Sequence, residues 1–223
     1  MAKLAVVGML AVAPAAMAGA AHAQVWIEQA KICENARMTP DERIDACTRE
    51  LAALPEWLHS MRATALVQRS DANLAGQKLA EAIADADAAV AEDTENIAAQ
   101  NAKCWTRAVA NRELGVARAA CDHAIGLNQE DAAVWDSRGL VGLREQKWQA
   151  AWTDYNQAYA LRGAMIGSLY GRGLAALALG REEEGLVDIS TAINSNPSVV
   201  SEFQSYGLTP GELRAKSSGA KPG

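Results

Sequence analysis

The sequence predicts an all-α protein built from stacked antiparallel helical hairpins. The segment 135–143, WDSRGLVGL, aligns with the segment 34 residues later, 169–177, LYGRGLAAL. Ala, Leu, Glu, Arg and Gln dominate and no alternating strand pattern occurs. The prolines at positions 40, 55, 197 and 210 lie at expected helix boundaries. A period of this length is typical of a solenoid, in which each hairpin completes its core against its neighbours.

Residues 1–23 are expected to be a signal peptide. Lys3 precedes a stretch of small apolar residues, and Ala21-His22-Ala23 matches the small-x-small pattern of a cleavage site. We place the cut after Ala23, with Ala16-Met17-Ala18 as a second possible site. A retained membrane anchor is the alternative, which Pro14 and the run of alanines disfavour. We therefore expect a periplasmic or secreted protein with no stable membrane anchor after cleavage.

Irregular helical hairpins are expected over residues 24–97. Thr39, Pro40 and Glu42 predict a helix start, since Thr39 can cap, Pro40 fits the first turn and Glu42 completes a capping box. That helix should run to about Leu54 and pair with a short helix over 25–34. The next hairpin is expected as a helix over 56–69, a turn at 70–73 and a helix over 74–91.

Three regular hairpins and a capping helix are expected over residues 98–207. The units are 98–131, 132–165 and 166–199, and the cap is 198–205, because a solenoid needs its last apolar face covered. Turns within the units are predicted at 111–113, 145–147 and 180–181. Residues 208–223 are expected to be a mostly disordered tail, in which Thr209-Pro210-Gly211-Glu212 allows one more helical turn.

The regular units resemble the tetratricopeptide repeat (TPR) family. The residues at the family's positions in the best unit are Trp135, Gly139, Ala151, Tyr155 and Ala158, and those in the next are Leu169, Gly173, Ile189, Ala192 and Pro197. The sequence departs from the family pattern at three positions: Arg138 and Arg172 stand where Leu is usual, and Trp105 stands where a small residue is expected. The resemblance implies a TPR-like helical hairpin solenoid, a right-handed superhelix of antiparallel helix pairs.

The resemblance also implies a concave groove, lined by the first helices of successive repeats, that binds a protein or peptide. The residues it places there are Thr106, Val109, Asp136, Leu140, Leu143, Arg144, Tyr170, Leu174 and Leu177. This mainly apolar surface suits an amphipathic helix or an extended segment. Some family members hold a C-terminal carboxylate with Lys and Asn, but the corresponding places here are Ala102, Thr106, Asp136 and Leu140, which argues against such a clamp.

The four cysteines suggest disulfides, because an even count in an exported chain is typical of them. Cys33 and Cys47 lie about equally far from the turn near Thr39, and Cys104 and Cys121 from the turn near Arg112. Each pair could therefore bridge its own hairpin. Four buried thiols are the alternative, and four cysteines allow three connectivities.

No constellation of residues predicts catalysis, a metal or a cofactor. In Cys121-Asp122-His123 the side chains point in different directions on a helix, so they cannot act as a nucleophile and base. His59 is the only other His after the leader, and no Cys-x-x-Cys occurs. The formal net charge is −6 without a Lys/Arg patch, which argues against nucleic acid.

These observations favour a non-catalytic protein–protein interaction module or scaffold in the bacterial cell envelope. A self-associating structural oligomer is the alternative, and an envelope enzyme is a third hypothesis. Trp105, Trp135 and Trp148 are expected in the core, whereas Trp26 and Trp57 are candidates for exposed binding anchors.

Overall fold

A computed structural model describes residues 26–217, with side-chain surroundings defined up to Leu213. All regular structure in this range is α-helical. The expected signal peptide, residues 1–23, lies outside the described residues. A helical segment over residues 26–33 precedes α2 (Pro40–Ala53) and forms the first hairpin with it.

Four further hairpins follow along the chain. Their first helices are α3 (His59–Ala75), α5 (Ile97–Ala110), α7 (Ala132–Arg144) and α9 (Ile166–Ala178). Their second helices are α4 (Leu79–Glu92), α6 (Leu114–Leu127), α8 (Trp148–Leu161) and α10 (Glu182–Ser195). Two short helices, α11 (Ser198–Ser205) and α12 (Pro210–Ser217), close the described part of the chain.

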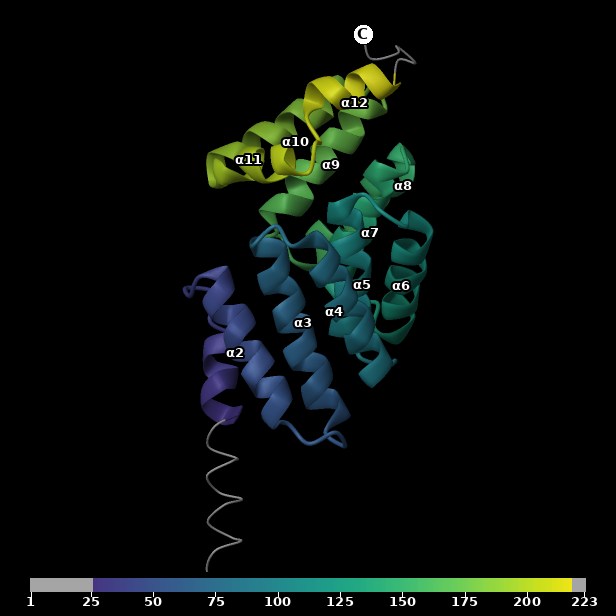
Figure 1. Ribbon diagram of the computed structural model, residues 1–223. Helices are drawn as coiled ribbons and strands as arrows, with labels where there is room; N and C mark the ends of the chain where they lie inside the picture. Colours follow the sequence, from purple (N-terminus) through teal and green to yellow (C-terminus); the bar gives the residue numbers. More distant parts are fainter. Residues whose placement is uncertain (1–25, 218–223) are drawn as a thin grey trace, which may run out of the picture.

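The hairpins stack into two layers (Figure 1). Each first helix contacts the first helix of the next hairpin, from α3 through α5 and α7 to α9. The second helices, within the described residues, contact first helices but not one another. The first helices therefore form a continuous inner layer, and the second helices form a spaced outer layer. The expected all-α hairpin solenoid is confirmed.

The turns inside these four hairpins share one backbone geometry. In each turn an N–H donates to the carbonyl five residues back; the pairs are Lys78 to Asn73, Arg112 to Arg107, Lys147 to Gly142 and Arg181 to Ala176. The residue before each donor is left-handed, with φ of 59° at Gln77, 52° at Asn111, 59° at Gln146 and 77° at Gly180. This is the hydrogen bond that commonly ends a helix. The predicted turns at 111–113, 145–147 and 180–181 coincide with these turns.

The predicted turn at 70–73 is wrong, because α3 runs through it to Ala75. Ser70 and Asn73 are buried and bond across the hairpin instead of meeting solvent. The Ser70 hydroxyl donates to the Ala82 carbonyl at 2.8 Å, and the Asn73 amide donates to the Asp85 carboxylate at 2.9 Å. Polar residues that look like a turn in the sequence are here polar contacts between two helices.

Two capping boxes start helices α2 and α12. At α2 the Glu42 N–H donates to the Thr39 hydroxyl, and the Thr39 N–H donates to the Glu42 carboxylate, as predicted. Thr209 and Glu212 make the same pair of bonds at α12. The expected disordered tail over 208–223 is therefore corrected in part, because residues 210–217 form α12, which is docked on α9. Residues 218–223 lie outside the described residues.

Both disulfides lie within hairpins, as the spacing suggested. Cys33 is bonded to Cys47 with their Cα atoms 4.8 Å apart, and Cys104 is bonded to Cys121 with their Cα atoms 5.5 Å apart. All four residues are fully buried. In the chain-entropy model, closing a loop of this size stabilises the folded state by roughly 3 kcal/mol. The two bonds thus fix the first and third hairpins.

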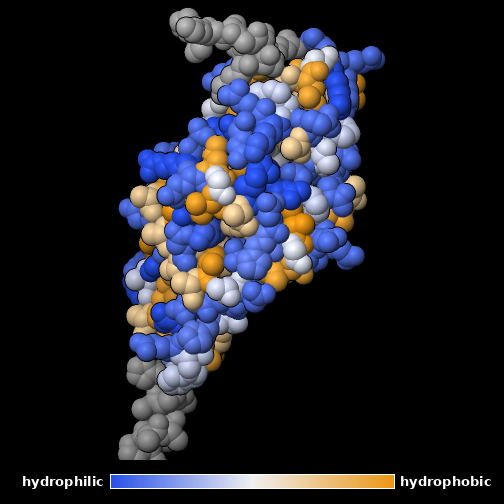
Figure 2. Space-filling view, turned by 90° about the vertical axis from the view of Figure 1, so that its right-hand side faces the viewer, coloured by the Kyte–Doolittle hydropathy of each residue, from blue (hydrophilic) through white to orange (hydrophobic). Residues whose placement is uncertain are grey.

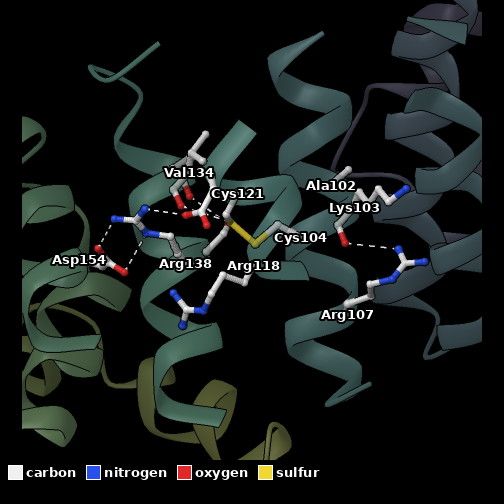
Figure 3. Close-up of a disulfide and its surroundings, with 12 residues drawn as sticks. Ala102, Lys103, Cys104, Arg107, Arg118, Cys121, Val134, Arg138 and Asp154 are labelled. Carbon is white, nitrogen blue, oxygen red and sulfur yellow. Dashed lines mark hydrogen bonds and ion pairs between the residues drawn. A yellow bond between two sulfur atoms is a disulfide. The ribbon is translucent and has the colours of Figure 1, made fainter. Parts of the chain in front are cut away.

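The other three hairpins are each closed by an arginine–aspartate pair sixteen residues apart. The pairs are Arg69–Asp85, Arg138–Asp154 and Arg172–Asp188. In each pair the guanidinium donates twice to the carboxylate, at 2.6 to 3.0 Å. Figure 3 shows the Arg138–Asp154 pair beside the Cys104–Cys121 bond of the neighbouring hairpin. Arginine at the family's leucine position is therefore explained by this bidentate pairing.

The same three arginines also join each hairpin to the one before it. The remaining guanidinium nitrogen of Arg138 donates to Asp122 on α6, and that of Arg172 donates to Asn156 on α8. Arg69 donates in the same way to Thr48 on α2. Each arginine thus holds three helices together, which constrains the angle between successive hairpins.

We predict that Arg138→Leu destabilises the fold by about 3 kcal/mol, because Asp154 is then left buried without its partner. The Asp154 side chain, which is paired with Arg138, is only 5% exposed. Urea unfolding followed by circular dichroism measures the loss. The double variant Arg138→Leu/Asp154→Leu should lose less than the sum of the two single variants. The exposed pair Arg49–Asp45 supplies the control, since Arg49→Leu should change stability little. Equal losses from Arg138→Leu and Arg49→Leu would contradict this role.

Candidate binding face

The inner face is the side of the α3, α5, α7 and α9 layer that lies away from the second helices. In the last two hairpins its positions recur at a spacing of 34, since Asp136 and Leu140 on α7 match Tyr170 and Leu174 on α9. These four side chains belong to the set that the resemblance assigns to a groove. Leu140, Tyr170 and Leu174 are almost completely buried, and Asp136 is half-buried.

The register of α5 differs from that of α7 by one residue. Cys121 and Tyr155 occupy equivalent places 34 residues apart, and each meets the first helix of its hairpin. Cys121 meets it at Cys104, whereas the Tyr155 ring faces Gly139, where an added Cβ would lie 2.9 Å from the ring. Because Cys104 and Gly139 are 35 residues apart, Trp105 is equivalent to Leu140. Trp105 therefore turns onto the inner face instead of clashing with α6.

Thr106 consequently lies one place away from the predicted groove position. Its side chain is fully buried, and its hydroxyl donates to the Ala102 carbonyl of its own helix at 2.8 Å. Asn101, one turn before Trp105, is the α5 equivalent of Asp136 in the corrected register. Sequence reasoning at a strict 34-residue spacing missed both Asn101 and Trp105. The signal that could have revealed them is Trp105 itself, a large residue at a position that requires a small one.

The C-terminal segment, defined here as residues 198–213, covers the α9 end of the inner face and reaches Trp105 on α5. α11 contacts α9 and α10, and α12 packs along α9, as Figure 1 shows at the yellow end of the ribbon. The Phe203 ring lies 4.9 Å from the Tyr170 ring, and the Tyr206 ring lies 5.9 Å from the Trp105 ring, between ring centroids. Leu208 and Leu213 are 1% and 0% exposed, so this segment is part of the main core.

The predicted groove residues belong to the same core cluster as the C-terminal segment or lie at its edge. Five of these residues are buried: Leu140, Leu143, Tyr170, Leu174 and Leu177. Three others are half-buried: Val109, Asp136 and Arg144. Arg144 donates to the Ala108 and Val109 carbonyls at 2.9 and 3.0 Å, so it joins the end of α7 to the end of α5. The inner face is thus an apolar surface with polar groups at its margins.

Asp136 is an acidic group of the inner face on α7. Burial raises its pKa to about 6, and the nearby charge of Glu202 on α11 adds to this rise. The Ser168 hydroxyl, which donates to the Asp136 carboxylate, acts in the opposite direction. Burial also lowers the pKa of Arg144, and the charge of Glu212 on α12 opposes that shift. The C-terminal segment therefore interacts with this face electrostatically as well as through apolar contacts.

One polar atom of the inner face lacks a partner. The Asn101 Oδ1 atom is buried and accepts no hydrogen bond within the described part of the chain. A buried acceptor without a donor costs about 1–3 kcal/mol. A donor from a bound segment would remove that cost.

Other surfaces show less organisation. Figure 2 shows the face on the right-hand side of Figure 1, where apolar groups form small separate patches among polar side chains. Cys121 is held in a disulfide, so the Cys121-Asp122-His123 sequence offers no thiolate nucleophile. Within residues 26–217, no group of three or more His, Cys, Asp or Glu residues is placed to hold a metal ion. The helices of that range are all too short or too polar to cross a membrane.

We predict that Asp136→Asn stabilises the protein at pH 8 and has little effect at pH 4. The folded state holds the Asp136 proton more tightly than the unfolded chain does, because the pKa is raised. The contribution of Asp136 to stability is therefore complete below about pH 4 and is lost as the pH rises through 6. Thermal melting at the two pH values tests this, with the exposed Glu130→Gln as control. The same change in Tm at both pH values would be inconsistent with it.

Comparison with known proteins identifies the architecture. No protein-family model matches the sequence, and no curated protein matches it. A crystal structure of the MamA protein superposes with a TM-score of 0.57 at 20% identity, over 84% of this chain and 98% of that one. TTC0263, a thermophilic TPR protein from Thermus thermophilus, superposes with a TM-score of 0.63 at 17% identity, over 89% of this chain and 98% of that one.

A third structure is the first TPR of Spaghetti (RPAP3) bound to an HSP90 peptide. It superposes with a TM-score of 0.50 at 21% identity, over 55% of this chain and 98% of that one. These similarities agree with the hairpin period, the two-layer stack and the residues at the family's small positions. The chain therefore has the fold of tetratricopeptide repeat proteins.

Proposed function

We propose that the protein is a non-catalytic interaction scaffold of the bacterial cell envelope, which binds a helix or peptide of a partner protein on its inner face. The observation that carries this proposal is that the inner face already accommodates a helical segment, the chain's own residues 198–213. A surface that accepts α11 through Tyr170 and Trp105, and α12 along α9, has the shape and chemistry to accept another amphipathic helix.

The chemistry of the inner face indicates what such a partner segment carries. Tyr170 and Trp105 contact the aromatic rings of Phe203 and Tyr206, so a partner should present aromatic or large aliphatic side chains at helical spacing. The partner segment should also place a hydrogen-bond donor near Trp105, where the Asn101 Oδ1 atom has no partner. The RPAP3 repeat, which has this fold, is bound to a peptide, and this supports a peptide or protein ligand here.

The cysteine pairs support the envelope location. Two buried disulfides are typical of proteins that fold in oxidising compartments such as the periplasm. Export also agrees with the leader pattern of residues 1–23. Together they favour a partner in the periplasm or at a membrane surface.

We predict that Leu213→Glu increases capture of the partner severalfold. The substitution places a charge at a fully buried site of α12, which should release the C-terminal segment from α9. If a partner competes with that segment, its apparent affinity for the protein is limited by the fraction of molecules in which the segment has left the inner face. The measurement is quantitative affinity purification from envelope extracts after mild crosslinking.

Val187→Glu is the matched control, because Val187 is 57% exposed on α10, where the same charge meets solvent. Hydrogen exchange should show faster exchange in α12 for Leu213→Glu only. If α12 is released and capture does not increase, the partner does not use the inner face. Recovery of the protein's own chain alone would favour the self-associating oligomer instead.

A further inference from the structure

A pocket of about 370 Å³ lies at the opposite end of the chain from the C-terminal segment. The helical segment 26–33, α2 and α3 contribute to it, with Glu34 directly after the first of these. Its lining residues are Trp26, Ala30, Glu34, Glu50, Ser60, Met61, Thr64 and Gln68. The pocket therefore joins one aromatic ring, two apolar side chains, three neutral polar side chains and two carboxylates.

Glu50 is the unusual group in this pocket. It is 6% exposed, and its Oε2 atom is buried without a hydrogen-bond partner in the described part of the chain. Burial, and then the charge of Glu34, raise the pKa of Glu50 to about 7. A buried carboxylate without a counter-charge is costly, so the fold retains an acceptor that its own residues do not use.

Two arginines on the helices that line the pocket are paired with other groups. Arg43 on α2 donates to the Cys33 and Gln68 carbonyls. Arg62 on α3 donates to the Glu92 carboxylate and to the Leu51 and Leu54 carbonyls. The charged residues among those that line the pocket are both acidic. The site is therefore complementary to a positive charge from outside the chain.

The pocket walls select among cations. A hard metal ion such as Ca²⁺ takes six to eight oxygen ligands, whereas Trp26, Ala30 and Met61 make much of this wall apolar. An ammonium or guanidinium group on a carbon chain fits better, because its stem packs against apolar side chains and its charge lies over an aromatic ring.

We propose that this pocket binds an organic cation, an ammonium or guanidinium group, with Trp26 against the cation and Glu50 and Glu34 as acceptors. The group would be carried either by a lysine or arginine side chain of a partner or by a free amine. The pocket shares α3 with the inner layer but is lined by none of the predicted groove residues, so the proposed function does not depend on it.

The test is a nuclear magnetic resonance titration of the purified, disulfide-bonded protein at pH 8. The probes are the tripeptide amide acetyl-Ala-Arg-Ala, the free diamine 1,4-diaminobutane, and acetyl-Ala-norleucine-Ala amide as the uncharged control. We expect the backbone amides of Ala30, Thr64 and Gln68 to shift with at least one cationic probe and not with the control. Tighter binding of the peptide assigns a partner's basic side chain, and tighter binding of the diamine assigns a free amine.

Glu50→Gln should weaken binding of the cationic probe at least tenfold while the protein stays folded, because it removes a charge and keeps the shape. Trp26→Leu should weaken binding less, and Leu186→Ala, an exposed site on α10, should leave it unchanged. The proposal is overturned if no cationic probe shifts these amides at millimolar concentration, or if Glu50→Gln binds as tightly as the natural protein. Neither result would bear on partner capture by the inner face.

Discussion

Closure of each hairpin by one link between its two helices is the constraint on which the structure depends. Alanine-rich helices bury little apolar area per residue, so packing alone holds them weakly. The chain adds a disulfide in the first and third hairpins and a bidentate arginine–aspartate pair in the other three. Since each arginine also bonds to the preceding hairpin, the same contacts set the stacking. The first helices are thereby aligned into one layer with a continuous inner face.

The C-terminal segment follows from that alignment. A continuous apolar inner face must be covered, and Phe203, Leu208 and Leu213 cover its α9 end. The cover is short, since α11 and α12 have 8 residues each. It also approaches charged groups, because Glu202 and Glu212 act on Asp136 and Arg144. A short terminal cover is easier to displace than a central helix, and this makes the inner face suitable for exchange with a partner helix.

Much of the fold follows from the sequence, because the 34-residue repeat, the capping box at Thr39 and the paired cysteines are local signals. Three features required the structure. Ser70 and Asn73 look like a turn, but they are buried polar contacts between α3 and α4. The one-residue shift of α5 places Trp105 rather than Thr106 on the inner face, which spacing alone does not reveal. The third feature is the ordered C-terminal segment, which was expected to be disordered. Leu208 and Leu213 are buried by contacts with residues far away in sequence, and a local sequence pattern does not reveal such contacts.

The most direct test of the account is site-specific photocrosslinking in the native envelope. A photoreactive amino acid at position 101 lies on the inner face beside Trp105, whereas one at position 186 lies on α10, where Leu186 is 48% exposed. The account predicts a defined adduct with another protein from position 101 and none from position 186. Adducts from position 186 alone, or the same adducts from both positions, would contradict the inner face as the binding surface.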